Sequence, residues 1–481
     1  MHAHTAEWSL LKMFEIGFSK IDITPEIGCL MAGHVGLKQS TGIADRLFAN
    51  AMSICSGLNT IVLVSVDVLF IDAQAIMAIK KRIGQETRLN PHNLFCSSTH
   101  THSGPMTMGL FGREGQDDYV VLMIEKIVRA VKDSIRHTVS AQLFVSKARV
   151  KGIAFCERII MKGGRVETHP FRYDPDIIAP ESVTDDEFYV LTAVKDGKNL
   201  GMYVNFASHP QVMERENPLI SADYPGSIEQ ALQQAFGDDF IMLFGLGACG
   251  DVCPVNAMSD ENIEIGEAYK NQVGQTMARA IVSSLAHQEE LHGEIKVVNA
   301  SVNLEKRAIA KEKLHCAYEY IETCEPAEVP VCSNYGVEAP GSGVISLNEY
   351  LQHPYWKLQE SMDIIKLNQL NEISQYEEVE FNVIAIGNSL TLLTTPFELF
   401  SEIGLAIKTY SPFKNTMVIE LCNGSAGYLP TEKAFALPGG YETLTLVSSR
   451  FAEDSSRIVI RKAIDLLEEM MDKIEQERKF R

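Results

Sequence analysis

The chain has 481 residues, enough for one large domain or several ordinary ones, and it is 46% hydrophobic and 22% charged. This balance is typical of a packed globular protein and excludes a disordered one. Lys and Arg number 43 against 63 Asp and Glu, which gives a net charge of −20. Such a charge argues against a nucleic-acid-binding protein, which needs a basic face, and gives no attraction to anionic membranes.

The sequence shows no recognisable targeting or membrane segment. No stretch is long and apolar enough to cross a bilayer, and the start lacks the cationic, apolar and small-residue regions of a signal peptide. The 10 cysteines are too sparse in a chain of this length for a disulfide framework. We therefore expect a cytoplasmic protein with reduced cysteines, in which residues 1–12 form an N-terminal extension.

Apolar, β-branched runs alternate with segments of helical periodicity, which predicts an α/β fold with a mixed sheet core and surrounding helices. After a first strand in "FEIGFSKIDITP", the predicted strands cover residues 59–69, 93–98, 141–150, 187–194, 200–208, 240–245, 294–304, 378–387, 389–395 and 416–421. The predicted helices cover residues 73–87, 117–137, 226–236, 264–287, 309–323, 347–370, 398–409 and 450–475.

Domain organisation follows from composition along the chain. No composition break marks a linker, so we expect one large domain over residues 13–481. The polar, helical stretch 305–376 is interrupted by the loop sequence "EVPVCSNYGVEAPGSG". We interpret it as a helical insertion within that domain.

Three histidines follow predicted strands. In "SSTHTHSGP", His100 and His102 are two residues apart, so in an extended chain both side chains point to the same side. His209 ends the apolar run "YVNFAS", where Pro210 stops the strand. Neutral imidazole is a good zinc donor, although a single His-x-His pair or strand-end histidine is often structural. Three histidines at two strand ends favour a metal site.

Four further side chains are candidates because of where they fall in the pattern. Glu398 is predicted to open a helix, where an acidic residue also interacts favourably with the helix dipole. Arg158 comes after a strand, where a single arginine is normally a surface charge. Tyr428 and Tyr441 lie in the glycine-rich loop sequence "CNGSAGYLPTEKAFALPGGYE", which suits either a pocket wall or an ordinary surface loop.

The apolar run "FIMLF" ends in the turn "LGACGDVCPVN", which carries Cys253 at its tip. A strand that ends in a tight turn is a usual place to direct a reactive side chain into a cleft. The position of Cys253 alone leaves three roles open: a nucleophile, a neighbour of a metal, or a space-filling residue.

Several segments, in this order, resemble the neutral/alkaline non-lysosomal ceramidase family from about Phe14 to the last helix: "FSKIDITPEIG", "THTHSGP", "NFASHP", "SADYPG", "GACGDVCPVN", "TTPFELF" and "NGSAGYLP…GGYE". The resemblance implies a zinc-dependent amidohydrolase. It also implies four ligands of Zn²⁺: His100, His209, Glu398 and Tyr428. It further implies that three more side chains line the reaction centre: His102, Arg158 and Tyr441.

The family carries serine in the turn where this chain has Cys253, and its members are typically exported and carry a further C-terminal β-sandwich domain. Cys253 then has three interpretations: a nucleophilic thiolate activated by zinc and Arg158, a pocket-lining residue beside a zinc-activated water, or a zinc ligand that closes the site. We expect a hydrolase that cleaves the amide bond of an N-acylated small molecule or ceramide-like lipid. The alternative is a zinc-binding protein whose chemistry is altered or lost.

Overall fold

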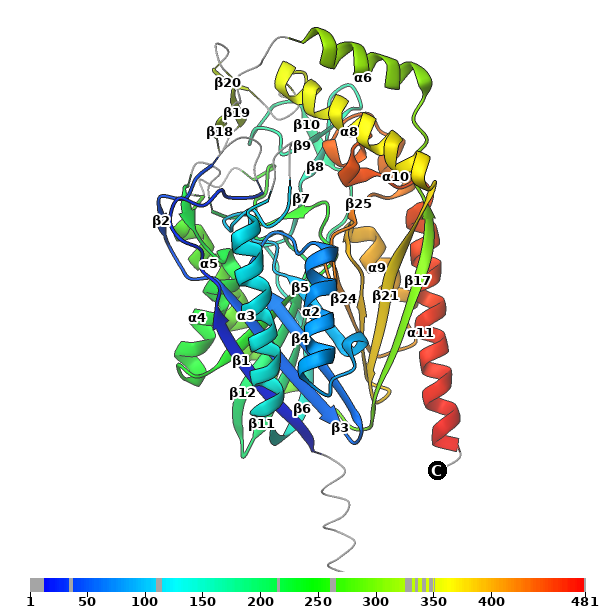
Figure 1. The fold of residues 1–481 in the computed structure, drawn as a ribbon. Helices are drawn as coiled ribbons and strands as arrows, with labels where there is room; N and C mark the ends of the chain where they lie inside the picture. The colour runs from blue at the N-terminus through cyan, green and yellow to red at the C-terminus, as the bar shows by residue number, and fades with distance from the viewer. Residues whose placement is uncertain are drawn as a thin grey trace, which may run out of the picture.

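The protein is built from two β-sheets that pack face to face, with helices on their outer faces, as the computed structural model shows (Figure 1). The structure describes residues 13–33, 38–109, 115–213, 217–259, 265–324, 331–333, 336–339, 343–345, 349 and 351–479. The extension expected at 1–12 and part of the insertion expected at 305–376 lie outside these residues. The expected α/β class with a mixed sheet is confirmed.

The larger sheet has the strand order β14-β12-β11-β6-β1-β3-β4-β5, and β16 pairs with β6. Neighbouring strands are antiparallel except for two pairs, β4 with β5 and β12 with β14, which are parallel. Its strands are β1 (Phe14–Asp22), β3 (Phe48–Ser56), β4 (Asn59–Val66), β5 (Leu94–Ser98), β6 (Val139–Arg149), β11 (Glu187–Lys195), β12 (Lys198–Phe206), β14 (Ile241–Leu246) and β16 (Glu289–Glu290).

The smaller sheet has the order β17-β21-β22-β24, and its last pair is again parallel. Its strands are β17 (Ile295–Glu305), β21 (Tyr376–Ile386), β22 (Leu390–Thr394) and β24 (Asn415–Ile419). Short strands complete the loops: β2 (Gly42–Ile43), β7 (Phe155–Cys156), β8 (Arg158–Met161), β9 (Val166–Thr168), β10 (Ile177–Pro180), β13 (Leu219–Ile220), β15 (Val252–Cys253), β23 (Phe397–Leu399) and β25 (Gly427–Leu429).

The described helices lie on the sheets and in the segments between their strands. They are α2 (Ala73–Glu86), α3 (Asp117–Arg136), α4 (Asp223–Phe236), α5 (Glu267–Ser284), α6 (Lys311–Thr323), α8 (Pro354–Ile373), α9 (Ser401–Tyr410), α10 (Glu432–Phe435) and α11 (Ser455–Lys479). Helices α2 and α3 pack on β1, β3 and β4, whereas α4 and α5 pack on β11, β12 and β14. Helices α9 and α11 cover the smaller sheet (Figure 1).

The alternation of side chains along β21 explains how one strand serves two cores. Phe381 and Val383 face α9 and α11, whereas Ile384 and Ile386 face the larger sheet. Successive strand residues point to opposite faces, so a strand covered on both sides is apolar at nearly every position. This is why the sequence pattern of such strands is a continuous apolar run.

Each parallel pair within the two main sheets is joined by a crossover that contains a helix: α2 between β4 and β5, α4 between β12 and β14, and α9 between β22 and β24. Parallel strands need such crossovers because both strands run in the same direction. The carboxyl ends of a parallel pair share one edge of the sheet, and ligands of α/β proteins bind at such edges. The carboxyl ends of these three strand pairs are therefore the positions at which functional side chains are expected.

The segment between β17 and β21 leaves the smaller sheet and returns to it at paired residues. The two strands pair antiparallel over their whole length, so Glu305 lies opposite Tyr376. Helices α6 and α8 pack together within the segment and lie at one end of the molecule (Figure 1). It also contains a three-stranded sheet, β18 (Val331–Ser333), β19 (Gly336–Ala339) and β20 (Gly343–Ile345), within the sequence expected to form a loop that interrupts the helical insertion.

Two local differences between the predicted and the observed elements have a clear physical cause. The helix predicted from residue 398 begins at Ser401, because Glu398 lies in β23, which pairs with β25. Strand β3, "FANAMSICS", was missed although it is central in the larger sheet. Its small Ala and Ser side chains lack the β-branched character on which strand recognition depends.

Candidate metal and catalytic centre

The candidate side chains follow the carboxyl ends of the parallel strands. His100 and His102 follow β5, His209 follows β12, Cys253 follows β14, and Glu398 follows β22. His100 and Glu398 come from different sheets, yet Nε2 of the histidine lies 3.3 Å from Oε2 of the glutamate. The edges of both sheets therefore meet at one point.

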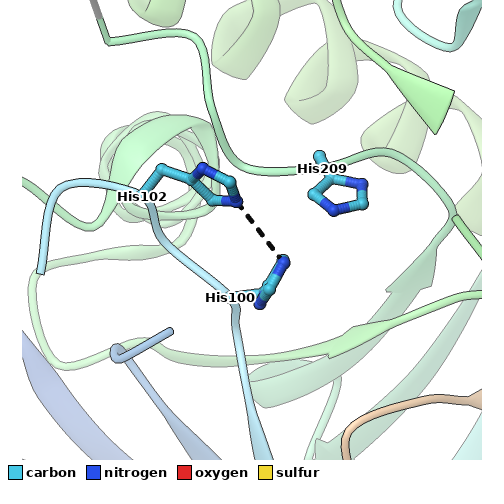
Figure 2. Close-up of side chains that lie close together, drawn as sticks. All are labelled: His100, His102 and His209. Carbon is cyan, nitrogen blue, oxygen red and sulfur yellow. Dashed lines mark hydrogen bonds between the residues drawn. The ribbon is translucent and has the colours of Figure 1, made fainter. Parts of the chain in front are cut away.

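The three histidine rings face one another, and Figure 2 shows their nitrogens directed into a common space. Nε2 of His102 lies 3.4 Å from Nε2 of His100. The ring centroids of His100 and His209 are 4.8 Å apart, and those of His102 and His209 are 5.6 Å apart. His100 and His209 are each 1% exposed, so their rings are held by the protein interior.

Backbone carbonyls fix the orientation of two of these rings. Nδ1 of His100 lies 2.9 Å from the carbonyl oxygen of Leu69, and Nδ1 of His209 lies 3.1 Å from that of Val252. A carbonyl only accepts, so the proton of each neutral ring is on Nδ1, and the lone pair is on Nε2. Both lone pairs then point at the space between the rings, as in a histidine that binds a metal.

The Glu398 carboxylate brings a negative charge to the same space. It is 2% exposed, and its Oε2 has no hydrogen-bond donor among the described residues. Oε2 lies 3.3 Å from Nε2 of His100 and 3.7 Å from Nε2 of His209. Burial alone would raise the pKa of Glu398, but its interactions with His100 and His209 outweigh this and lower the pKa to about 2.

The histidine lone pairs and the Glu398 carboxylate are all acceptors, so a cation between them would be stabilised. Ligands of a tetrahedral zinc ion with bonds of 2.0–2.1 Å are about 3.3 Å apart, which is close to the separations around His100. Burial alone would lower the pKa of His209, but Glu398 and Glu157 raise it to about 9, so a proton supplies positive charge when no metal does. A divalent ion would replace that proton. The donor set therefore fits zinc.

Glycines leave room for the site at two positions. A Cβ on Gly33, where φ is +95°, would lie 2.7 Å from the ring of His102. A Cβ on Gly250 would lie 2.7 Å from the carbonyl oxygen of Glu398, and its amide donates to Leu399. The turn that carries Cys253 is thereby pressed against the strand that carries Glu398.

Asp251 makes a second connection between this turn and the Glu398 segment. Its buried carboxylate accepts hydrogen bonds from the amide and hydroxyl of Ser401 and from the hydroxyl of Ser182. Burial raises the pKa of Asp251 to about 6 although these hydrogen bonds oppose the rise. The Asp of the "GDV" turn is therefore structural, since it fixes the start of α9.

The two tyrosines of the segment between β24 and α11, called the late loop below, contact each other. Tyr428 lies directly opposite Glu398 in the pairing of β23 with β25. The hydroxyls of Tyr428 and Tyr441 are 3.1 Å apart. Burial, with the nearby charges of Glu398 and Glu157, raises the pKa of both phenols well above the usual value, so both remain protonated at neutral pH. Both tyrosines thus belong to the surroundings of the cluster.

Arg158 is fully buried and engaged on both sides of its guanidinium. Its Nε and Nη2 donate to Glu181 at 2.5 and 3.2 Å, and its Nη1 donates to Glu442 at 2.5 Å. The guanidinium also lies 5.4 Å from the centroid of the Phe400 ring. Glu442 is the neighbour of Tyr441, so Arg158 anchors the late loop. The family resemblance implies that Arg158 lines the reaction centre, and in the structure its guanidinium is engaged by Glu181 and Glu442.

Cys253 lies in a second group of donors that sequence reasoning missed. Its sulfur and the donor atoms of Glu157 and His169 all lie within 4.8 Å of one another. Nε2 of His169 is 3.2 Å from Oε2 of Glu157, and the Cys253 thiol donates to the Val255 carbonyl at 3.2 Å. Glu157 stands next to Arg158 in the sequence, but an isolated acidic residue gave no reason to single it out.

These features define an α/β protein with a cluster of imidazole and carboxylate donors at the carboxyl ends of its parallel strands. Residues 14–272 match the family profile described as neutral/alkaline non-lysosomal ceramidase, N-terminal, and the chain belongs to this family. The resemblance expected from the sequence is thus confirmed. Five candidate residues lie inside the matched range: His100, His102, Arg158, His209 and Cys253. Three lie beyond it: Glu398, Tyr428 and Tyr441.

Two solved structures share the fold. One, described as a ceramidase complexed with C2, is 17% identical, with a TM-score of 0.70 over 96% of this chain and 76% of that chain. The other, neutral ceramidase from Pseudomonas aeruginosa, is 18% identical, with a TM-score of 0.69 over 95% of this chain and 75% of that chain. Among the described helices, none combines the length and the apolar character needed to span a membrane.

Proposed function

We propose that this protein is a zinc-dependent hydrolase that cleaves the amide bond of an N-acylated, ceramide-like substrate. The observation that carries the proposal is the meeting of three imidazoles and the Glu398 carboxylate at the edges of both sheets, in a member of the ceramidase family. Ceramide is an N-acylated lipid, so the family name and a site suited to amide hydrolysis agree.

His100, His209 and Glu398 would hold the zinc ion. The fourth donor is a choice between two side chains: Tyr428, which the family resemblance implies, and His102, whose Nε2 lies 3.4 Å from Nε2 of His100. When bound, zinc acts as a Lewis acid that polarises an amide carbonyl and acidifies water. The catalytic pathway otherwise depends on what the chain's own side chains donate and hold.

Tyr441 is suited to stabilising the negative charge that develops on the amide oxygen. The side chain is half-buried and its phenol stays protonated at neutral pH, so it can act as a hydrogen-bond donor. A preorganised donor lowers the barrier of acyl transfer, because it does not reorganise during the reaction. His102, when it is not a zinc ligand, would deliver a proton to the leaving amine.

Arg158 would act through Tyr441 and not on the substrate. Its guanidinium is 0% exposed and already donates to Glu181 and Glu442. A cation neutralised by two carboxylates has little attraction left for an oxyanion. Its contribution is therefore to hold the backbone of the late loop, with Tyr441, over the cluster.

Cys253 takes the place of a family serine, and its three interpretations lead to different chemistry. As a nucleophile, its sulfur would bond to the amide carbon, the amine would leave with a proton, and water would release the acid from the thioester. As a pocket-lining residue it would leave the attack to water. As a further ligand of the same zinc ion it would close the site and alter or abolish the chemistry, which is the alternative function.

The test is metal analysis of the purified protein followed by assays of amine release from N-acyl substrates of increasing chain length. We expect bound zinc and a rate that rises with chain length, as a lipid-binding pocket requires. A rate independent of chain length would point to a small polar N-acyl compound instead. Absence of bound metal, with metal content unchanged in His100→Ala and His209→Ala, would contradict both the hydrolase and the alternative.

A further inference from the structure

A second set of metal-donor side chains lies beside the three-histidine cluster. Glu157 follows β7, His169 follows β9, and Cys253 lies in β15, so three separate segments bring a carboxylate, an imidazole and a thiol together. We propose that Glu157, His169 and Cys253 bind a second zinc ion. This inference goes beyond the proposed hydrolase and does not require that activity.

The distances within this second donor group suit one ion. All three donor atoms lie within 4.8 Å of one another, and the 3.2 Å between Nε2 of His169 and Oε2 of Glu157 is close to the ~3.3 Å expected between two ligands of tetrahedral zinc. Glu157 also accepts from the side chain of Gln211 at 3.0 Å, which holds its carboxylate in place. Such support of a ligand by a neighbouring hydrogen bond is usual in metal sites.

The chemistry of the three donors selects the metal. A thiolate together with an imidazole and a carboxylate is a donor set for zinc, whereas Mg²⁺ and Ca²⁺ prefer oxygen ligands alone. Cys253 is 3% exposed and the Glu157 side chain 1%, whereas the His169 side chain is 23% exposed. The group is therefore closed toward the core and open on the side of His169. The Cys253 thiol now directs its proton to Val255, and metal binding would release that proton.

Short backbone connections join the two donor groups. Both the amide and Nδ1 of His209 contact the carbonyl oxygen of Val252, the residue before Cys253. Gln211, two residues after His209, holds Glu157. The second group of donors is therefore coupled to the first through these contacts, and an ion held by it would add positive charge near the first group.

The backbone pairing explains why Cys253 belongs to the second group. Strand β15 pairs with β7, so Cys253 lies opposite Phe155 and Val252 lies opposite Cys156. Glu157 directly follows β7, and the His169 amide donates to the Glu157 carbonyl at 2.9 Å. Three short segments are thus hydrogen-bonded into one unit whose side chains converge.

Zinc content measured by mass spectrometry on the full chain tests this inference. We expect about two zinc ions per chain in the wild type and about one in Cys253→Ser, Glu157→Gln and His169→Gln. Cys156→Ser is the matched control, since it removes a buried thiol from the adjacent strand, and it should keep both ions. His169→Gln keeps the experiment decisive if a buried substitution prevents folding, because His169 lies partly at the surface.

Cobalt substitution gives a readout that does not depend on activity. Co²⁺ bound to Cys253 should give a thiolate-to-metal absorption band in the near ultraviolet that is present in Cys156→Ser and lost in Cys253→Ser. One zinc ion in the wild type, lost in His209→Ala, would overturn the second site and leave the proposed hydrolase intact. Two ions that persist in all three variants would overturn the assignment of these ligands, and no bound zinc would overturn the hydrolase as well.

Discussion

The two donor groups of this protein are built in different ways. The histidines of the first group follow β5 and β12, strands of five and nine residues in the larger sheet, and Glu398 lies in β23 directly after the buried strand β22. The group of Glu157, His169 and Cys253 lies on or after strands of two or three residues. Long strands fix their ends through many hydrogen bonds, whereas short strands depend on a few backbone contacts and on the side chains themselves. The first group is therefore preorganised by the fold, and the second needs an ion to complete it.

Removal of a histidine from the first group gives the largest expected effect. His209→Ala removes a metal donor, so zinc content should fall and kcat/KM should fall by roughly 10³-fold or more, because the Lewis acid is lost. The exposed His287→Ala is the control and should behave as the wild type. Steady-state kinetics with metal analysis checks this. A His209 variant that keeps both zinc and activity would contradict the assignment of His209 as a zinc ligand.

Arg158 connects the late loop to the core, and its loss should affect stability strongly. Arg158→Met leaves Glu181 and Glu442 buried without a cation, at a cost of about 3–5 kcal/mol in the free energy of unfolding. Denaturant unfolding measures this. The double variant Arg158→Met/Glu442→Gln should recover part of the loss, and kcat should fall more than KM rises because Tyr441 is misplaced. Unchanged stability together with a raised KM would instead indicate direct contact with substrate.

The fourth donor of the first group can be identified by two substitutions. Removal of the residue that binds zinc should weaken zinc affinity by about 10–100-fold. Removal of the other of these two side chains should lower turnover while zinc stays bound. Tyr428→Phe and His102→Ala are the variants, and competition with a chelator measures the affinity. The separation between the His100 and His102 nitrogens favours His102 as the donor. Loss of zinc in Tyr428→Phe alone would contradict this.

Substitution of Cys253 separates the contribution of the second group from that of the first. We expect Cys253→Ala to lose one zinc ion and to lower kcat/KM by about 10–100-fold. The loss should be smaller than in His209→Ala because the first group is left intact. Loss of activity without loss of metal would favour the nucleophile. Full activity in the Ala variant would exclude a nucleophile, and increased activity in either the Ala or the Ser variant would favour a ligand that blocks the site.

The last effect concerns the pH dependence of stability and not catalysis. Asp67 follows β4 and accepts from the amide of Phe48, and burial raises its pKa to about 7. Because the folded pKa lies above the unfolded value, Asp67 favours the folded state at low pH, and this stability is lost as the pH rises from about 4 through 7. Asp67→Asn should remove about 1–3 kcal/mol of that pH dependence. Thermal unfolding at pH 5 and 8 measures the difference, and an unchanged difference would contradict it.

The histidines of the first group were predictable from the sequence because an apolar strand precedes each of them. The run before His209 and the run before His100 are recognisable as buried strands, and a histidine directly after such a strand must lie at a sheet edge. Glu398 was found, but its position in β23 was not, since a three-residue strand has too few residues to show alternation. The convergence of two sheets at one point is a tertiary property that no local pattern encodes.

The second group escaped sequence reasoning for a related reason. Cys253 was conspicuous because its turn is rich in glycine and proline, but Glu157 and His169 lie in a stretch without periodicity. Only the pairing of β15 with β7 brings Cys253 near Glu157, which precedes it by almost a hundred positions in the chain. Side chains with ordinary local sequence become a site through pairing of short strands, and such pairing leaves little trace in the composition.

The pairing of Glu305 with Tyr376 makes the segment between β17 and β21 replaceable. Since the two ends of the intervening segment are neighbours in β17 and β21, a short hairpin turn would close the sheet without it. The segment touches the late loop through Asp363, which accepts from Val447, and through Arg307, which donates to Thr443 and Leu444. Its replacement by another sequence would reshape the surroundings of Tyr441 and spare the strands that carry His100, His209 and Glu398, so specificity and catalysis can evolve separately.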